Sequence, residues 1–333
     1  MKITYIFRAP SKERSIERVF APIISQMKLQ GHSTYSSFAW DLRLWLISMV
    51  ANVIRFAIKS YVGGLYHITG DVQYVACLMN PKNTVLTIHD CVMLHNESAP
   101  LWLRRMIRIF WYEIPLRRLK YITCISETTR EDIISFFPWV ADKLTVIPNP
   151  VGEEFRHCPK EINDECPQIL HVGTRSNKNL ERVIEALGGI HCRLHIIGKL
   201  TEEQVHLLEK HHIHYKNSYH ISDAAVVTAY QYADIISFPS LFEGFGMPII
   251  EGQATGRPVL TSDREPMRTV AGKGACLVDP ESVESIRHGF EALINDKNYY
   301  CAVNQAGVEN AGIYDIKHVS AEYQSVYELI QRK

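Results

Sequence analysis

Residues 238–251 of the chain read Phe-Pro-Ser-Leu-Phe-Glu-Gly-Phe-Gly-Met-Pro-Ile-Ile-Glu, and the apolar run Ile235–Phe238 leads into them. The run predicts a short buried strand. Gly244 and Gly246 let the loop backbone approach a ligand closely, and Pro248 is favoured in the first turn of a helix. A strand, a glycine loop and a helix N-terminus together predict a βα unit that offers free N–H groups to a phosphate or a polyol.

Two carboxylates flank the loop. Glu243 lies at its start, and Glu251 is expected in the first turn of the helix. A carboxylate accepts two hydrogen bonds from a vicinal diol, so Glu251 is a candidate for binding the ribose of a nucleotide. The spacing alone leaves a second interpretation open, in which Glu251 only offsets the positive end of the helix dipole.

A second glycine loop follows the first strand of the C-terminal half. Gly173 permits a sharp turn there, and the cations Arg175 and Lys178 stand just before a predicted helix. Cations, turn N–H groups and a helix N-terminus together suit a diphosphate. The alternative is a solvated loop in which Asn177 or Asn179 caps the helix.

Ten short apolar runs alternate with helical patterns, which predicts βαβ units with parallel sheets, and hence an α/β fold. The length of 333 residues favours two domains. The boundary is expected near residues 148–150, because residues 1–149 carry 18 Lys and Arg against 11 Asp and Glu, whereas residues 150–333 carry 18 against 25. The basic half could attract phosphates or an anionic membrane, or it could attract the acidic half across a cleft. The predicted strands are 3–7, 66–69, 84–88, 121–125, 144–147, 169–172, 193–197, 235–238, 259–261 and 275–278.

The composition limits the class of protein. The eight cysteines form no CxxC pair, and several lie in apolar runs, so we expect reduced core residues and no structural zinc. Met1-Lys2 runs straight into a strand-like segment, which argues against a signal peptide. The longest apolar stretch, 44–54, is too short to span a bilayer. These features predict a cytoplasmic protein.

The segment from Phe238 to Asp263 resembles the signature of glycosyltransferase family four, the large retaining group with the GT-B fold. That family carries two glutamates separated by seven residues in an E-G-F-G-x-P context, and Glu243 and Glu251 match this spacing. The loop His171–Asn179 is similar to the family's donor-phosphate loop, although it is about one residue shorter, and Ile197-Gly198-Lys199 also matches. The resemblance runs through nearly the whole C-terminal half and is looser in the N-terminal half.

The resemblance implies two Rossmann-like, doubly wound domains that face one another across a cleft. Residues 1–149 would form the acceptor side, with a C-terminal helix at 317–333 packing back on it, and residues 150–316 would bind the donor. The implied reaction is a retaining, metal-independent transfer of a hexose, such as mannose, from a nucleotide sugar. The acceptor would be a saccharide or a lipid-linked saccharide in cell-surface polysaccharide synthesis, with no cofactor and no nucleic acid involved.

The resemblance also implies roles for individual residues. Glu251 would bind the ribose, and Glu243 would contact hydroxyls of the donor sugar. Lys178, with Arg175, would neutralise the leaving diphosphate, since no DxD motif is present to hold a metal. The remaining expected donor-site residues are Gly173, Lys199, Gly244, Phe245, Gly246 and Met247.

The N-terminal half offers weaker candidates. His89 and Asp90 follow a predicted strand, where relatives place a His or Asp that faces the donor sugar; alternatively, Asp90 only caps a turn. Arg8, Lys12 and Arg14 in the first loop hint at an anionic acceptor, or mark a solvated turn.

Residues 101–120 contain six cations together with two tryptophans. Cations and Trp at helical spacing suit a helix on an anionic membrane surface, which would make the protein peripheral on the inner face of the membrane. The alternative is a core helix with a solvated basic face.

Two further functions fit the same scaffold. One is a nucleotide-sugar epimerase, and the other is a non-catalytic nucleotide-sugar-binding subunit. The two glutamates and the Lys178 loop favour transfer over both.

Overall fold

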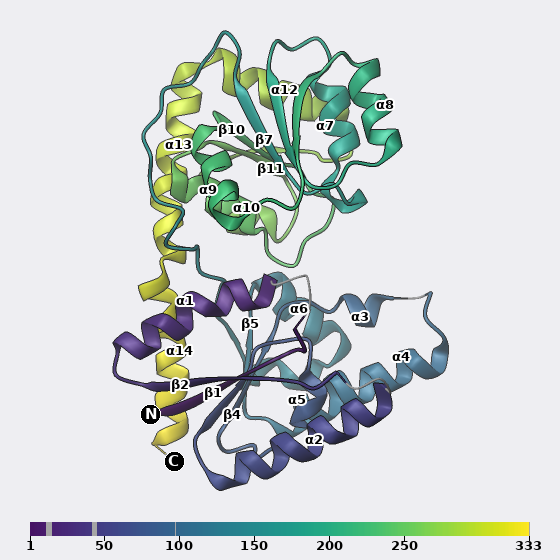
Figure 1. Ribbon diagram of the computed structural model, residues 1–333, viewed down its shortest axis with the longest axis vertical. Helices are drawn as coiled ribbons and strands as arrows, with labels where there is room; N and C mark the ends of the chain where they lie inside the picture. Colours follow the sequence, from purple (N-terminus) through teal and green to yellow (C-terminus); the bar gives the residue numbers. More distant parts are fainter. Residues whose placement is uncertain (11–14, 42–44, 97, 333) are drawn as a thin grey trace. The chain divides into compact units, whose positions relative to one another are not determined.

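The computed structural model describes residues 1–10, 15–41, 45–96 and 98–332, and it forms two compact units. The first unit consists of Met1–Pro150 together with Ile316–Lys333, and the second consists of Val151–Asp315. Each unit is an α/β structure built on one parallel sheet of six strands (Figure 1). No helix in the described part of the chain is long and apolar enough to cross a membrane.

The sheet of the first unit has the strand order β2-β1-β3-β4-β5-β6, with every pair parallel. The order reverses between β1 and β3, so the sheet is doubly wound. The strands are β1 (Lys2–Phe7), β2 (Ser33–Phe38), β3 (Leu65–Ile68), β4 (Thr84–Ile88), β5 (Tyr121–Cys124) and β6 (Leu144–Val146).

The helices of the first unit lie between these strands in the chain. The helix expected within residues 101–120 is interrupted: α4 ends at Ile107, and a π-helical turn, η2 (Arg108–Glu113), precedes α5. Pro115 contributes to this break, because a proline cannot donate the backbone hydrogen bond that would continue a regular helix. The helical elements are α1 (Ser15–Leu29), α2 (Trp45–Val62), η1 (Gln73–Cys77), α3 (Val92–His95), α4 (Leu101–Ile107), α5 (Ile114–Arg118), α6 (Glu127–Phe136), η3 (Pro138–Lys143) and α14 (Ile316–Gln331).

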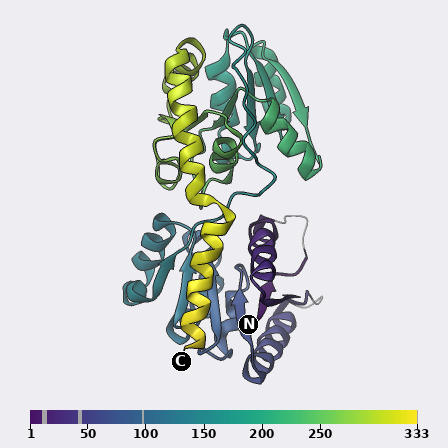
Figure 2. The same cartoon turned by 90° about the vertical axis from the view of Figure 1, so that its left-hand side faces the viewer.

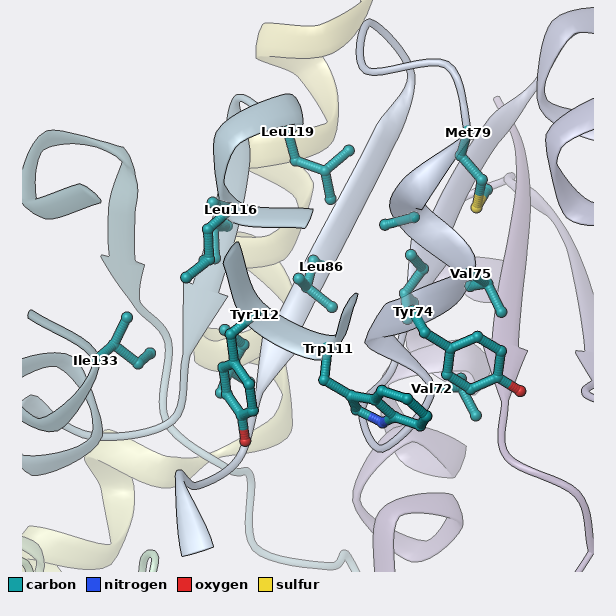
Figure 3. Close-up of a cluster of buried hydrophobic side chains, with 14 of the residues drawn as sticks. Val72, Tyr74, Val75, Met79, Leu86, Trp111, Tyr112, Leu116, Leu119 and Ile133 are labelled. Carbon is teal, nitrogen blue, oxygen red and sulfur yellow. The ribbon is translucent and has the colours of Figure 1, made fainter. Parts of the chain in front are cut away.

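The π-helical turn places aromatic rings in the core. Trp111 and Tyr112 are both buried there, and the Trp111 ring lies 4.7 Å from the ring of Tyr74 in η1. Figure 3 shows them with Leu86 of β4 and Leu116 of α5 in one apolar cluster. One side of the segment 101–118 therefore packs into the core, while Arg105 and Arg108 are exposed on the other side.

Helix α14 packs beside α1 in the first unit, as Figures 1 and 2 show. It brings Tyr327 to the buried side chain of His67, where Nδ1 of the histidine lies 2.6 Å from the hydroxyl. Nε2 of His67 lies 2.7 Å from Oγ1 of Thr87. Burial lowers the pKa of His67 to about 3, so the ring is neutral and links α14 to the sheet.

The second unit has the strand order β9-β8-β7-β10-β11-β12. Counted along the chain this is 3-2-1-4-5-6, the order typical of Rossmann folds, and it reverses between β7 and β10. The strands are β7 (Gln168–Val172), β8 (Arg193–Ile197), β9 (His214–Ser218), β10 (Ile235–Phe238), β11 (Val259–Ser262) and β12 (Ala275–Val278).

The helical elements of the second unit flank that sheet (Figure 1). They are η4 (Ser176–Lys178), α7 (Leu180–Leu187), α8 (Glu202–Lys210), α9 (Asp223–Tyr232), α10 (Met247–Thr255), α11 (Met267–Ala271), α12 (Val283–Asn295), α13 (Lys297–Ala311) and η5 (Gly312–Tyr314).

The α/β fold class with two doubly wound sheets is confirmed, but two strands were not predicted from the sequence. β2 reads Ser-Thr-Tyr-Ser-Ser-Phe and β9 reads His-Tyr-Lys-Asn-Ser, and each lies at an edge of its sheet. Edge strands stay largely exposed, so neither carries the apolar run that marks a buried strand.

Candidate active site

The loops singled out by sequence meet at the point where the strand order of the second unit reverses. β7 and β10 are neighbours there, with His171 paired to Ser237 in the parallel register. Ligands of doubly wound sheets bind outside the carboxyl ends of the strands at such a reversal. The loop after β7 and the loop after β10 both start from this edge.

Asn177 holds the two loops together. Its carbonyl accepts a hydrogen bond of 2.8 Å from the N–H of Leu241. Its side-chain Nδ2 donates to the carbonyl of Phe242 at 3.0 Å and to Oε1 of Glu243 at 3.2 Å. The position of Glu243 is therefore fixed by a residue 66 positions away in the chain.

Lys178 forms an ion pair with Glu243, with Nζ 2.6 Å from Oε1. The two side chains are 21% and 14% exposed, so both stay accessible while being largely sheltered from water. The ammonium also lies 4.7 Å from the centre of the Phe238 ring. The expected sugar-binding carboxylate and the expected phosphate-binding cation thus lie in direct contact.

Gly173 makes room for this lysine. Its φ of +98° is unfavourable for other residues, and a Cβ at this position would lie 2.7 Å from Cγ of Lys178. On the other side of Gly173, the hydroxyl of Thr174 donates to the carbonyl of Lys199 at 2.7 Å. The Lys199 backbone is thereby tied to the loop, while the side chains of Arg175 and Lys199 are exposed.

The structure does not support the alternative in which an asparagine side chain of the β7 loop caps α7. Asn179 occupies the N-cap position of α7 with φ +62°, yet its side chain makes no capping hydrogen bond. Its Nδ2 donates instead to the carbonyls of Pro239 and Pro280, at 3.0 and 2.7 Å. Both asparagines therefore shape the β7 loop against the β10 loop.

The β10 loop enters α10 through a left-handed residue. Gly246 has φ +117°, and a Cβ there would lie 2.9 Å from Cδ1 of Ile249. Phe245 is buried, with its ring 5.8 Å from that of Tyr314. α10 starts at Met247, one residue before Pro248, where the sequence placed the first turn. The backbone around Gly244, Phe245 and Gly246 is anchored at both ends.

The position of Glu251 in α10 differs from the one expected from the sequence. Glu251 is the fifth residue of α10, so it lies beyond the first turn, which contains no acidic residue. The influence of the helix dipole is strongest within that turn, so compensation of the dipole no longer explains the residue.

Tyr230 of α9 orients Glu251 and was not predicted from the sequence. Its hydroxyl donates to Oε2 of Glu251 at 2.7 Å. Burial, and then the charge of Glu251, raises the pKa of Tyr230 well above its usual value, so the hydroxyl keeps its proton. No local motif marks this tyrosine, because the contact spans 21 residues.

His171 is a second residue that the sequence did not single out as functional. It is fully buried, and its Nδ1 lies 3.2 Å from Oγ of Ser237. Burial, and then the nearby charge of Lys178, lowers the pKa of His171 to about 3. The ring is thus neutral, and its contact with Ser237 links the adjacent strands β7 and β10.

The N-terminal candidates lie at the carboxyl end of β4 in the first unit. Nε2 of His89 lies 2.7 Å from the carbonyl of Thr69, and burial lowers the pKa of this histidine. A Cβ on Gly70 would lie 2.6 Å from Cδ2 of His89. Asp90 is exposed, and its Oδ1 accepts from the N–H of Val92 at 3.1 Å, so it does cap a turn.

Arg8 lies at the strand reversal of the first unit. It pairs with Asp71 at 2.7 Å and lies 3.8 Å from Glu17. Two carboxylates already oppose its charge, which weakens the case for a free anion site at this residue. Lys12 and Arg14, the other cations of the predicted loop, lie outside the described residues.

The structure offers no group of three or more His, Cys, Asp or Glu side chains placed to hold a metal ion among residues 1–10, 15–41, 45–96 and 98–332. The cations predicted for the donor site, Arg175, Lys178 and Lys199, lie in or directly after the loops at the ends of β7 and β8.

Comparison with known proteins finds relatives among mannosyltransferases. The serotype-specific mannosyltransferase WbdA of Escherichia coli is 24% identical over 249 residues, which cover 66% of this chain and 30% of WbdA. The chain thus spans less than a third of that relative. The O-antigen chain mannosyltransferase B of Escherichia coli is 22% identical over 308 residues, covering 83% of this chain and 77% of the relative.

A solved structure shares the fold. Anabaena HepE in complex with UDP-glucose superimposes with a TM-score of 0.77 at 13% identity, covering 100% of both chains. The model described as "Glycosyl transferases group 1" matches residues 153–309, and the model described as "Glycosyltransferase Family 4" matches residues 25–155. The chain belongs to glycosyltransferase family four.

Proposed function

We propose that this protein transfers a hexose, with mannose as the first candidate, from a nucleotide sugar to a saccharide or lipid-linked saccharide acceptor. The transfer retains the anomeric configuration and needs no metal ion. The product is part of a cell-surface polysaccharide. Two relatives named as mannosyltransferases, one of them for the O-antigen chain, support the choice of sugar and pathway class.

One observation carries the proposal: the contact between Lys178 and Glu243 at the strand reversal. A cation and a carboxylate at this edge supply the two functions that a glycosyl diphosphate requires. The ammonium interacts with the phosphate oxygens, and the carboxylate accepts hydrogen bonds from sugar hydroxyls.

The second carboxylate completes the donor site. Glu251 accepts a hydrogen bond from Tyr230, and a carboxylate at this position is able to accept hydrogen bonds from the ribose hydroxyls. The backbone N–H groups from Gly244 to Met247 lie at the start of α10, where the helix dipole favours a negatively charged ligand.

In the proposed reaction the bond between the sugar C1 and the leaving phosphate oxygen breaks first, through an oxocarbenium-like transition state. The acceptor hydroxyl forms the new bond from the same face, and its proton passes to the leaving phosphate oxygen. Negative charge grows on the diphosphate as the bond breaks. Lys178, Arg175 and the N-terminus of α10 stabilise that charge because they are already in place.

The experiment is a nucleotide-release assay on the purified protein. GDP-mannose, UDP-glucose and UDP-galactose are each incubated with the wild type and with Glu243→Ala. Slow release of nucleotide from one donor by the wild type, with a rate at least tenfold lower in the variant, is expected for a residue that contacts the transferred sugar. NMR of the product with a simple mannoside acceptor then reports the anomeric configuration.

Two other outcomes would replace the proposal. A sugar that stays on the nucleotide but changes at a ring carbon would identify an epimerase. Binding of a donor without release under any condition, with or without acceptor, would identify a binding subunit.

A further inference from the structure

Among the described residues, three of the four that helix α2 buries are polar. The residues that it buries, spaced four apart, are Ser48, Asn52, Phe56 and Ser60. Its outer side exposes seven large apolar residues, each at least half exposed: Leu46, Ile47, Val50, Ile54, Ile58, Tyr61 and Val62. A surface helix of a globular protein ordinarily shows the opposite arrangement.

Specific hydrogen bonds fix α2 in this orientation. Asn52 accepts from the backbone N–H of Trp40 at 2.8 Å and donates to its carbonyl at 2.9 Å. Oγ of Ser60 donates to the carbonyl of Ala57 at 2.7 Å and accepts from the N–H of Asn80 at 2.9 Å. A rotation that buried the apolar side would break these bonds, so the outward apolar face belongs to the folded state.

The charged residues within α2 and α4 have one sign. α2 contains Arg55 and Lys59 and no acidic residue. Helix α4 exposes Leu101 and Trp102 and carries Arg104 and Arg105, again without an acid. No ion pair joins either arginine of α4 to another residue within the described ranges, whereas Arg117 of α5 is paired with Glu113.

Both helices rest on the same core element. Nδ2 of Asn52 in α2 donates to the hydroxyl of Tyr74 in η1 at 3.3 Å, and the ring of Tyr74 packs on Trp111, which follows α4. Met49 and Val53 of α2 and Leu103 and Met106 of α4 pack against one apolar cluster. The exposed sides of the two helices therefore belong to one rigid part of the first unit.

We propose that the outer face of α2, together with the N-terminal turn of α4, docks on an anionic lipid bilayer. α2 lies in the plane of the interface with Ile54 and Ile58 among the acyl chains, and Arg104 and Arg105 contact acidic headgroups. Apolar residues flanked by cations and aromatic side chains suit this environment. A second copy of the chain is a poorer occupant, because a symmetric contact would bring the basic residues of two α2 helices together.

The test is sedimentation with vesicles and does not depend on catalysis. The full-length protein is mixed with vesicles of phosphatidylcholine alone, or with phosphatidylglycerol added, at low and high salt. Ile54→Gln/Ile58→Gln removes the inserted side chains without adding charge, and Arg104→Gln/Arg105→Gln removes two cations. Ile313→Gln is the matched control, since Ile313 of the second unit is 53% exposed and Ile54 is 50% exposed.

We expect the wild type and Ile313→Gln to pellet with the anionic vesicles, and less so at high salt. The isoleucine pair should lose most of its binding at every salt concentration. The arginine pair should bind about fivefold more weakly for each cation removed at low salt, and should differ little from wild type at high salt.

Three results would overturn the proposal. The wild type could stay in the supernatant with anionic vesicles at low salt. The isoleucine pair could bind as well as Ile313→Gln. Light scattering without lipid could find a wild-type dimer that becomes a monomer in the isoleucine pair, which would assign the face to a second copy.

Discussion

The Nζ atom of Lys178 and the Oε1 atom of Glu243 are 2.6 Å apart, and this contact joins loops from two adjacent strands of the second unit. The Lys178 ammonium lies over the ring of Phe238, and both side chains of the pair are mostly sheltered from water. In the proposed reaction, the glutamate orients the cation before the donor arrives. A bound diphosphate would then share Lys178 with Glu243, and no large movement of the lysine is needed.

Removal of this cation should slow turnover strongly. In Lys178→Ala we expect kcat for donor cleavage to fall by about 10²- to 10³-fold, the range for loss of one preorganised group that stabilises transition-state charge. The measurement is the rate of nucleotide release at saturating donor.

The matched control is Lys297→Ala. Lys297 forms an exposed pair with Asp164, with Nζ 2.8 Å from the carboxylate, far from the donor loops in sequence. It should retain wild-type kcat. Equal losses in both variants would mean that the lysine at 178 stabilises the fold and has no specific role in the reaction.

Most residues of the candidate site could be singled out from the sequence, because the patterns that mark them are local. The glycine loops, the glutamate spacing and Lys178 are each readable within a few residues, and ten apolar runs matched strands of the sheets. Tyr230 and Asn177 act across 21 and 66 residues, so no local pattern marked their partners. The two edge strands were missed because an exposed strand needs no apolar run.

The inverted face of α2 shows another limit of pattern reading. A helical pattern in a sequence does not say which side of the helix faces the core. Asn52 and Ser60 find their hydrogen-bond partners in segments distant along the chain, and only the fold reveals that the polar side is the buried one.

The hydroxyl of Tyr230 should matter for donor affinity more than for the chemical step. Tyr230→Phe leaves one oxygen of Glu251 without its donor, so the carboxylate is less well oriented toward the ribose. We expect KM for the donor to rise about tenfold, equivalent to the loss of one hydrogen bond to a charged group, with kcat changed little.

Tyr232→Phe is the control for this variant. Tyr232 is the last residue of the same helix and is 72% exposed. Its donor KM should equal that of the wild type. A fall in kcat at unchanged KM for Tyr230→Phe would show instead that the tyrosine acts in the chemical step.

Chelation should leave the reaction unaffected. The proposed charge stabilisation uses Lys178, Arg175 and the start of α10, so nucleotide release should proceed at the same rate after dialysis against EDTA. The measurement compares this rate with that after addition of about 5 mM Mg²⁺ or Mn²⁺, which exceeds the dissociation constant of roughly 10⁻⁴ to 10⁻³ M of a weak divalent-cation site. A rate that depends on the added ion would require a metal-bound diphosphate in place of the mechanism proposed here.

Acid should destabilise the first unit through His67. The pKa of this histidine is about 3 in the folded protein and 6.5 in the unfolded chain, so the unfolded chain binds more protons between these values. The free energy of unfolding therefore falls as the pH drops below 6.5, by about 1.4 kcal/mol between pH 7.5 and 5.5 for one such residue. His171, with the same pKa of about 3, adds a similar loss in the second unit.

His67→Gln isolates the first of these contributions. Glutamine offers one donor and one acceptor to Tyr327 and Thr87 but does not titrate, so the variant should be less stable at pH 7.5 yet lose less stability on acidification. Urea unfolding at pH 7.5 and 5.5 should show a pH-dependent loss about 1.4 kcal/mol smaller than that of the wild type. His206→Gln, at an exposed position of α8, should keep the wild-type pH dependence. An identical pH dependence in His67→Gln and wild type would mean that the folded protein accommodates a proton on His67, contrary to its burial between α14 and the sheet.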